Sequence, residues 1–400
     1  MSAVLVLGSG FAGLWASLGA ARRLDELGAS PKDVSIKVVS SLPYHDIRVR
    51  NYEADLTQCR IPLQDVLDPA GVEHIAADVQ AINPTSHTVT TSLGQHTYDR
   101  LVVALGSQVV KPDIPGLHEF GFDVDTYDGA IRLQRHLEKL ADGDHTPAAA
   151  TAVVVGAGLT GIEAACELPA RLAALFPDTD AQVVLVDRNP HVGSDMGNSA
   201  RPVIEAALAS NRVRTRCGVG VASVKTNEVT LSTGEVLAAS TVVWCAGMRA
   251  NPLTTDLGGT RDGLGRVAVD DYLRVEGVQD VFAAGDVATA RMDDSHISVM
   301  SCQHGRPMGR FAGYNVISDL FGEPMLALRI PWYVTVLDLG PAGAVYTEGW
   351  DRQVIAEGPE AKLTKQIINT QRIYPPLNGN RDDILAAAAP TLQTRPAIDR

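Results

Sequence analysis

Two stretches of the chain share one succession of apolar and small residues. Residues 4–24 and 152–172 each begin with a run of branched apolar residues, continue with a glycine-rich turn and end in an alanine-rich segment. A short apolar run of this kind favours a buried strand, and apolar residues three and four positions apart favour a helix. The pattern therefore predicts the same strand–turn–helix unit twice, which indicates an α/β fold.

The first stretch has no charged residue from Ser2 to Ala21, which is about the length of a membrane span. Four glycines interrupt it, however, and no basic residue precedes it as a secretion signal requires. We therefore expect a strand, a turn and a helix here, with neither a signal peptide nor a transmembrane helix.

Both glycine turns have the spacing G-x-G-x-x-G. The first glycine of such a motif makes the tight turn, the second lets the backbone approach a pyrophosphate, and the third lets the helix pack closely on the strand. The helix N-terminus then points at the phosphates. Because both copies have the preceding strand and the following helix that the motif requires, we predict two dinucleotide sites. The first comprises Gly8, Gly10, Phe11, Ala12 and Gly13, and the second comprises Gly156, Gly158, Leu159, Thr160 and Gly161.

An acidic residue that binds the ribose hydroxyls is expected at the end of the second strand of each unit. In the second unit Asp187 takes this place, which favours NADH, and the neighbouring Arg188 leaves NADPH open. In the first unit Ser40 and Ser41 stand where the acid is expected. A serine hydroxyl binds a ribose more weakly than a carboxylate does.

The composition fits a globular protein of two to three domains, with 400 residues, 45% of them hydrophobic and 20% charged. The formal net charge of −13 repels phosphate backbones, which argues against a nucleic-acid partner. Five widely spaced cysteines without a CxxC pair indicate neither a disulfide framework nor a zinc ribbon. Such cysteine usage suits a reducing compartment, so we expect a cytoplasmic protein.

Further segments extend the pattern over most of the chain. Residues 98–107 (YDRLVVALGS) look like the strand that closes the first domain of two-dinucleotide flavoproteins, and residues 242–253 look like the strand that leaves their NAD domain. Residues 265–288, with Gly285 and Asp286 near their end, resemble the second FAD fingerprint. Over residues 1–375 the chain resembles glutathione-reductase-like proteins. It is most similar to the type II NADH dehydrogenases (NADH:quinone oxidoreductases) of the pyridine nucleotide-disulfide oxidoreductase superfamily.

This resemblance implies an α/β fold with two Rossmann-like dinucleotide-binding domains and a C-terminal α+β interface domain. The FAD-binding domain takes residues 1–112 and 254–325, the NAD(P)H-binding domain residues 113–253, and the C-terminal domain, for dimerisation or membrane docking, residues 326–400. The implied cofactors are FAD and NADH, with NADPH as an alternative. Further cofactor-binding residues implied by the resemblance are Val79, Ala104, Gly106, Ala246, Gly247, Gly285 and Asp286.

The resemblance also implies a reaction in which hydride passes from NAD(P)H to FAD and two electrons then pass to a quinone-like acceptor. Glu163 occupies the position where the family has a glutamate near the nicotinamide and the flavin. Its alternative reading is an exposed acid that complements the helix dipole. Tyr44 and His45, in a segment that follows the second strand, are either walls of the same pocket or a satisfied loop pair.

Residues 300–309 (MSCQHGRPMG) align with a family segment whose glutamines lie over the flavin and line the quinone pocket. We predict that Gln303 and His304 contact the isoalloxazine and the oxidising substrate, and a histidine there could donate a proton. One alternative is a helix start packed against the cofactor without chemistry. Another is a metal site of His296, Cys302 and His304, but the glycine–aspartate segment assigns this region to flavin, so we predict no metal.

The electron acceptor is the least constrained part of the prediction. No CxxxxC pair follows the second strand, which excludes a dithiol mechanism, and Cys302 alone does not make the cysteine pair of sulfide:quinone reductases. Residues 360–376 predict a short amphipathic helix without the aromatic face of a membrane anchor, so a surface helix or a homodimer contact competes with weak peripheral contact on the cytoplasmic face of the membrane. Two other function classes remain: a reductase of a small carrier protein such as ferredoxin or rubredoxin, and a flavin-binding redox sensor.

Overall fold

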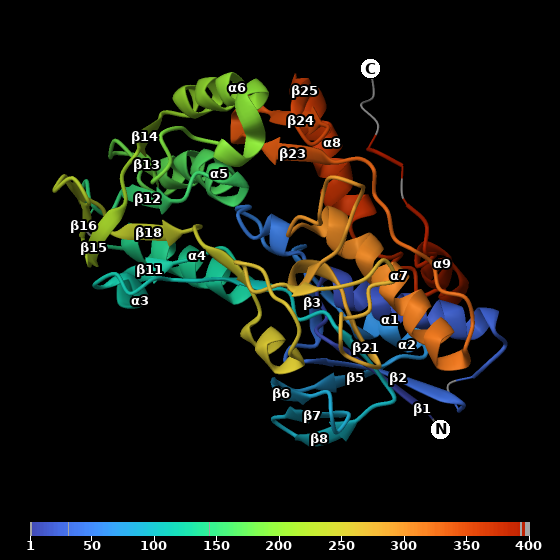
Figure 1. Cartoon of the computed structure of the whole chain (residues 1–400). Coiled ribbons are helices and arrows are strands. Elements are labelled where there is room, and N and C mark those ends of the chain that lie inside the picture. Colours follow the sequence, from blue (N-terminus) through green and yellow to red (C-terminus); the bar gives the residue numbers. More distant parts are fainter. Residues whose placement is uncertain (1, 31, 144, 393, 397–400) are drawn as a thin grey trace.

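The two glycine turns lie on two separate parallel sheets of the computed structural model, which describes residues 2–30, 32–143, 145–392 and 394–396 (Figure 1). The first sheet has the strand order β21-β9-β1-β2-β5, and all its neighbours are parallel. Its strands are β1 (Ser2–Leu7), β2 (Val34–Ser40), β5 (Glu73–Ala76), β9 (Arg100–Val103) and β21 (Val281–Ala283).

The second sheet has the order β11-β18-β12-β13-β14 and is also parallel throughout. Its central strands are runs of valine buried on both faces, as expected for a parallel sheet covered by helices. The strands are β11 (Gly121–Phe122), β12 (Thr151–Val155), β13 (Gln182–Asp187), β14 (Val213–Cys217) and β18 (Thr241–Trp244). The helices of this unit are α3 (Leu117–Phe120), α4 (Tyr127–Ala141), α5 (Leu159–Leu175) and α6 (Gly197–Ser210).

Two helices of the first unit touch backbone to backbone. They are α1 (Phe11–Glu26), which follows the first glycine turn, and α7 (Cys302–Phe321). A Cβ on Gly309 would lie 2.3 Å from the carbonyl oxygen of Ala12, and one on Gly313 would lie 2.1 Å from that of Ala16. Any larger residue would push the helices apart, so these glycines hold the start of α7 beside the start of α1. The shorter helices α2 (Gln64–Ala70) and α9 (Arg381–Ala387) pack against α1 and against each other.

A third sheet lies beside α6, near the top of the view in Figure 1. It is antiparallel and consists of β23 (Val334–Asp338), β24 (Ala344–Glu348) and β25 (Gln353–Gly358), followed by α8 (Pro359–Ile367) and a π-helical turn (Ile368–Arg372). The smaller antiparallel pairings are β3 (Tyr44–Asp46) with β4 (Arg60–Pro62), β6–β7–β8 (Val79–Asn83, Thr88–Thr91, Gly94–Thr97), β10 (Ser107–Val109) with β19 (Met248–Ala250), and β15–β16–β17 (Val221–Lys225, Glu228–Leu231, Val236–Ala238).

The α/β class with two Rossmann-like units is confirmed by this topology. The exact domain boundaries at residues 112/113, 253/254 and 325/326 stay predictions. In the part of the chain that the structure describes, no helix combines the length and the apolar character needed to cross a membrane.

Candidate functional site

The first glycine turn is shaped to hold a phosphate group. Gly8 has φ +96°, and a Cβ on Gly13 would lie 1.9 Å from the carbonyl oxygen of Gly8. A Cβ on Gly10 would meet nothing within 4 Å. No side chain of the described residues caps the start of α1 and no acid stands in its first turn, so its first amide groups are not satisfied by a cap. The turn therefore fits the pyrophosphate of a dinucleotide.

The second glycine turn repeats this geometry at the start of α5, where Leu159 and Thr160 form the first helical positions. Gly156 has φ +106°, and a Cβ on Gly161 would lie 1.7 Å from the carbonyl oxygen of Gly156. Here too no side chain caps the helix. The space at the middle glycine, Gly158, is less open than that at Gly10, because the Asp195 carboxylate lies 3.5 Å from where a Cβ on Gly158 would be.

The residue at the end of the second strand is an aspartate in β13 and a serine in β2, and the two side chains have different partners. The Asp187 carboxylate accepts hydrogen bonds from the backbone N–H groups of Ala157 (2.5 Å) and Asn189 (2.6 Å), so it is fixed beside the second glycine turn. The Ser40 hydroxyl lies 3.1 Å from the Leu42 carbonyl and 2.9 Å from the His74 ring. Ser40 is therefore already engaged within the protein. Ser41 and Arg188 are both exposed.

The other predicted cofactor residues share one location, the loops that leave the carboxyl ends of the parallel strands. This is the edge where open α/β sheets bind their ligands. The carbonyl oxygen of Ala104 would meet a Cβ on Gly8 at 2.5 Å, so the loop after β9 also lines the first turn. The residues concerned are Ala104 and Gly106 after β9, Ala246 and Gly247 after β18, Gly285 and Asp286 after β21, and Val79 at the start of β6.

Asp286 is held by a polar network that joins both units. Its carboxylate accepts a 2.5 Å hydrogen bond from the Ser107 hydroxyl, and Arg48 donates to the hydroxyl and the carbonyl of Ser107, both at 3.0 Å. Arg48 also pairs with Asp125. Burial raises the pKa of Asp286, while Ser107 and Arg48 act against this rise. Arg48 follows the second strand in the same segment as Tyr44 and His45, but no sequence motif marks it.

Glu163 is buried against the C-terminal sheet, with 6% of its surface exposed. Its Oε1 lies 2.7 Å from the Lys365 ammonium and accepts the Asp338 backbone N–H at 3.2 Å. Burial raises the pKa of Glu163, and Lys365 opposes this effect. For Lys365, burial lowers the pKa, but attraction to Glu163 and Asp338 outweighs it and the net shift is upward. The alternative reading of Glu163 as an exposed helix-start acid is wrong.

A second ion pair lies next to the first. Lys362 lies 2.5 Å from the Asp338 carboxylate, which also accepts the Tyr52 hydroxyl at 3.1 Å. Lys362 and Lys365 are three positions apart on α8, so both project from one face. That spacing was the available sequence signal for this network. The lysines of the predicted amphipathic helix therefore point inward, and it is Leu363 that is exposed on this helix.

The start of α7 offers two buried donors without a partner. The Val299 N–H donates to His304 Nδ1 at 2.8 Å, which leaves the proton on Nε2, and Nε2 has no acceptor. The Gln303 carbonyl accepts weakly from the Val334 N–H at 3.4 Å, and its amide nitrogen is unpaired. The His304 ring lies in an aromatic cluster with Tyr333 and Trp350, at centroid distances of 5.5 and 5.9 Å. Contact of Gln303 and His304 with the flavin stays a prediction.

Acid is expected to destabilise the protein through His304. Burial lowers its pKa from the ordinary 6.5 to about 4. The stabilising contribution of the neutral ring is therefore complete above pH 6.5 and is lost as the pH falls through 6.5 towards 4. The loss amounts to about 3 kcal/mol, because each pKa unit corresponds to about 1.4 kcal/mol. Urea unfolding of the wild type and His304→Gln at pH 7 and pH 4 measures it; equal losses in both proteins would contradict the assignment.

Tyr44 and His45 differ in their exposure to solvent. His45 is fully buried, its Nδ1 lies 2.8 Å from the Ser9 carbonyl, and its ring packs edge to face with Phe11 at 5.0 Å. His45 therefore packs against the first glycine turn. Its Nε2 atom has no hydrogen-bond partner among the described residues. Tyr44 is exposed, and the Arg60 guanidinium lies 4.7 Å from its ring.

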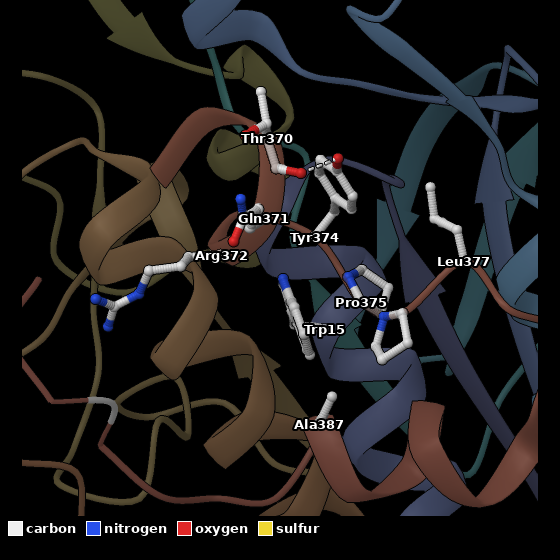
Figure 2. Close-up of a pocket in the computed structure, with 9 residues that line it drawn as sticks. Trp15, Thr370, Gln371, Arg372, Tyr374, Pro375, Leu377 and Ala387 are labelled. Carbon is white, nitrogen blue, oxygen red and sulfur yellow. Dashed lines mark hydrogen bonds between the residues drawn. The ribbon is translucent and has the colours of Figure 1, made fainter. Parts of the chain in front are cut away.

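A cavity of about 500 Å³ opens between α1, the segment after α8, and α9 (Figure 2). Figure 2 shows the indole nitrogen of Trp15 pointing towards Gln371 and Tyr374, and this buried nitrogen has no hydrogen-bond partner. Tyr374 belongs to a small apolar cluster with Phe11 and Cys302, so the cavity adjoins the starts of α1 and α7. It is lined by Trp15, Thr370, Gln371, Arg372, Tyr374, Pro375, Pro376, Leu377 and Ala387.

Cys302 is the first residue of α7, and its thiol is free. Burial raises the pKa of the thiol, so it stays protonated at neutral pH. In the described ranges, no group of three or more histidine, cysteine, aspartate and glutamate side chains is placed to hold a metal ion.

Two Rossmann-like units with paired glycine turns define an oxidoreductase with one flavin-dinucleotide site and one nicotinamide-dinucleotide site. Residues 2–309 match the family described as pyridine nucleotide-disulphide oxidoreductase, and the chain belongs to this family. An NADH dehydrogenase-like protein of Mycobacterium tuberculosis is 70% identical over 400 residues, which cover 99% of this chain and 100% of that protein.

A type II NADH:quinone oxidoreductase of Staphylococcus haemolyticus is 26% identical over 399 residues, covering 93% of this chain and 95% of the relative. The solved structure of NDH2 from Plasmodium falciparum covers 97% of both chains with a TM-score of 0.77; at 11% identity it shows the fold alone. Within the family, the chain belongs to the type II NADH dehydrogenase branch and is an FAD-dependent NAD(P)H dehydrogenase.

Proposed function

We propose that this dehydrogenase passes two electrons from NADH to a quinone with a bicyclic aromatic head group. The observation that carries the proposal is the cavity at Trp15. Its volume of about 500 Å³ lies within the range of small-molecule sites, and its walls are mostly aromatic and apolar with few polar groups. The indole N–H of Trp15 is buried behind this wall, and it would donate to a quinone carbonyl once the wall side chains move apart on binding.

The preference for NADH rests on Asp187. Its carboxylate is fixed beside the second glycine turn, where it would accept hydrogen bonds from the ribose hydroxyls and repel the 2′-phosphate of NADPH. Arg188 is exposed and could partly offset this repulsion. We therefore expect kcat/KM to be higher for NADH than for NADPH.

The first site would hold FAD, with the glycine turn at the pyrophosphate and Asp286 at the ribityl chain. When bound, FAD supplies the hydride acceptor and the two-electron donor that the protein lacks. Asp286 is oriented for this contact by Ser107 and Arg48. The buried pair of Glu163 and Lys365 joins α5 to α8, and the Asp338 N–H, which also donates to Glu163, joins α5 to β23.

The protein's own groups can also donate a hydrogen bond to the acceptor. Reduction of a quinone to a quinol takes up two protons, and the Nε2–H of His304 is a buried donor without a partner. The pKa of about 4 makes the neutral ring the form that would donate a hydrogen bond rather than a full proton at pH 7. We propose that His304 orients the acceptor through this N–H group.

Location and assembly form a further part of the proposal. We propose a cytoplasmic protein that reaches a lipid quinone by weak peripheral contact with the membrane, and a homodimer formed through the C-terminal sheet. Leu363 and Leu377 lie near the cavity segment and are about half exposed, which supports contact with an apolar surface.

The test is a reductive titration of the purified protein. Excess NADH without oxygen is expected to bleach the flavin absorption, and menadione is expected to restore it. Recovery with ferredoxin or rubredoxin but not with menadione would favour the carrier-protein reductase instead. Slow recovery with every acceptor would identify a redox sensor, and a protein that cannot be loaded with flavin would refute the whole proposal.

The Trp15→Phe variant tests the quinone cavity independently of the nicotinamide site. The variant keeps an aromatic ring, although a smaller one, and loses the indole N–H; a hydrogen bond of this kind contributes about 1 kcal/mol. We expect KM for menadione to rise roughly fivefold. The rate of flavin reduction by NADH, followed by stopped flow, serves as the control and is expected to stay unchanged. An unchanged KM for menadione would place the quinone elsewhere.

A further inference from the structure

Two arginines on α7 are buried or half-buried and have no acidic partner among the described residues. Arg310 is 3% exposed, and Arg306, one turn earlier, is half-buried. Arg306 donates to the carbonyls of Cys302 and Arg372, and Arg310 donates to the carbonyl of Ala387. Arg310 also lies over the Trp15 ring, 5.1 Å from its centroid.

Carbonyl oxygens and an aromatic face satisfy hydrogen bonds, but they do not neutralise two positive charges. Burial lowers the pKa of both side chains, to about 10 for Arg310, so both still carry their charge at neutral pH. No carboxylate of the described residues contributes to either shift. This is unexpected in a chain with a net charge of −13, because a buried unpaired charge is strongly destabilising.

A small void lies beside these charges. Its volume is about 20 Å³, enough for one particle the size of a water molecule. Two of its polar wall atoms have no partner: Arg310 Nε and the Gln303 amide nitrogen. Both are donors, and Arg306 adds a third donor group. The remaining walls are apolar: Pro307, Ile330, Trp332 and Leu392.

The void is closed by the C-terminal tail. Leu392 forms one of its walls, and the tail is fastened just after this position. The Thr394 carbonyl accepts a 2.6 Å hydrogen bond from Arg372, and Arg395 pairs with Glu348 at 3.0 Å. A ligand in the void would therefore lie beneath the C-terminal tail.

We propose that Gln303, Arg306 and Arg310 form a binding site for one monatomic anion of the chloride type beneath the C-terminal tail. Water could fill the void and accept the donors, but it would leave two buried charges unneutralised. A carboxylate or phosphate group does not fit the volume. The anion stabilises the first two turns of α7, which carry Cys302 and His304. This inference does not depend on the identity of the electron acceptor.

Thermal unfolding in chloride-free buffer tests the proposal. The holoprotein is exchanged into sodium gluconate, and chloride is titrated in at constant ionic strength. We expect a saturable rise in Tm with chloride or bromide, because a ligand that binds the folded state alone stabilises it by mass action. Crystals soaked in sodium bromide are expected to show an anomalous peak between Gln303 and the two guanidinium groups.

Arg310→Met provides the matched variant. It removes one charge and keeps an apolar stem, so we expect its Tm not to depend on chloride and, in gluconate, to equal or exceed that of the wild type. The control, Arg216→Met, alters an exposed arginine paired with Glu235 and should keep the full chloride dependence.

Three outcomes would overturn the proposal: a wild-type Tm independent of chloride, no bromide peak at this site, or a bromide peak without any change in Tm, which would mark an adventitious ion only. If Arg310→Met does not fold, the wild-type titration and the bromide peak still decide.

Discussion

Replacing Lys365 with methionine is expected to lower the free energy of unfolding by about 3–5 kcal/mol, the usual cost of breaking a buried ion pair. The variant would leave the Glu163 carboxylate 6% exposed and without its counter-charge. The remaining hydrogen bond from the Asp338 N–H, at 3.2 Å, is too weak to replace the ammonium group. Urea unfolding followed by flavin fluorescence and circular dichroism measures the loss.

The loss should depend on pH in a defined direction. Burial already raises the pKa of Glu163, and removal of Lys365 raises it further. A carboxyl group with a raised folded-state pKa contributes stability below its unfolded pKa, and that contribution is lost as the pH rises through the folded value. Lys365→Met should therefore be less destabilised at pH 5 than at pH 8.

Lys362→Met is the matched control for Lys365→Met. The same helix carries both lysines, but Asp338, the partner of Lys362, keeps hydrogen bonds from Tyr52 and from the Gly340 N–H. Lys362 is also more exposed than Lys365. We expect a smaller loss of stability, and recovery of part of the Lys365→Met loss when Glu163→Gln is added. Equal losses for both lysines at every pH would contradict the role of the Glu163–Lys365 pair.

Gly10→Ala is expected to lower the affinity for FAD by two to four orders of magnitude without unfolding the apoprotein. A Cβ at this position meets no protein atom within 4 Å, so the change leaves the fold intact. The open space in front of it is where the pyrophosphate would approach the backbone. Loss of two charge-assisted hydrogen bonds of about 1.5–3 kcal/mol each accounts for the size of the effect.

Flavin content after purification and fluorescence titration of the apoprotein with FAD measure the change. Gly13→Ala is the contrasting variant, because its Cβ would lie 1.9 Å from the carbonyl oxygen of Gly8 and would disrupt the turn itself. We expect Gly13→Ala to lower the Tm of the apoprotein and Gly10→Ala to leave it unchanged. Normal flavin content in Gly10→Ala would show that the phosphate does not bind at this turn.

Sequence patterns predicted the two nucleotide-binding units because their signals are local. A strand, a glycine turn and a helix follow one another within about 20 residues, and each glycine is required by the backbone of its own turn. Asp187 at the end of β13 could be predicted for the same reason. The engagement of Ser40 with His74 could not, since His74 is brought to this strand end only by the pairing of β2 and β5.

Contacts between side chains that are far apart in the sequence could not be predicted from local patterns. The amphipathic pattern of residues 360–376 predicts a surface helix. The spacing of its lysines is the same whether they face water or buried carboxylates, so the sequence does not distinguish the two cases. Only the packing of α8 on the C-terminal sheet turns Lys365 towards Glu163, 202 residues away in the chain. Arg48 likewise reaches Ser107 and Asp286 only in the folded protein.

The amino-acid sequence by itself therefore determined the α/β class, the two dinucleotide turns and the family, because short-range backbone requirements leave direct traces in residue types. The tertiary structure alone decided which charges are paired, which donors are left without acceptors, and where a cavity opens beside Trp15. These properties depend on contacts between distant segments, and the free energy of a buried charge or an unpaired donor is set by the residues that surround it in space.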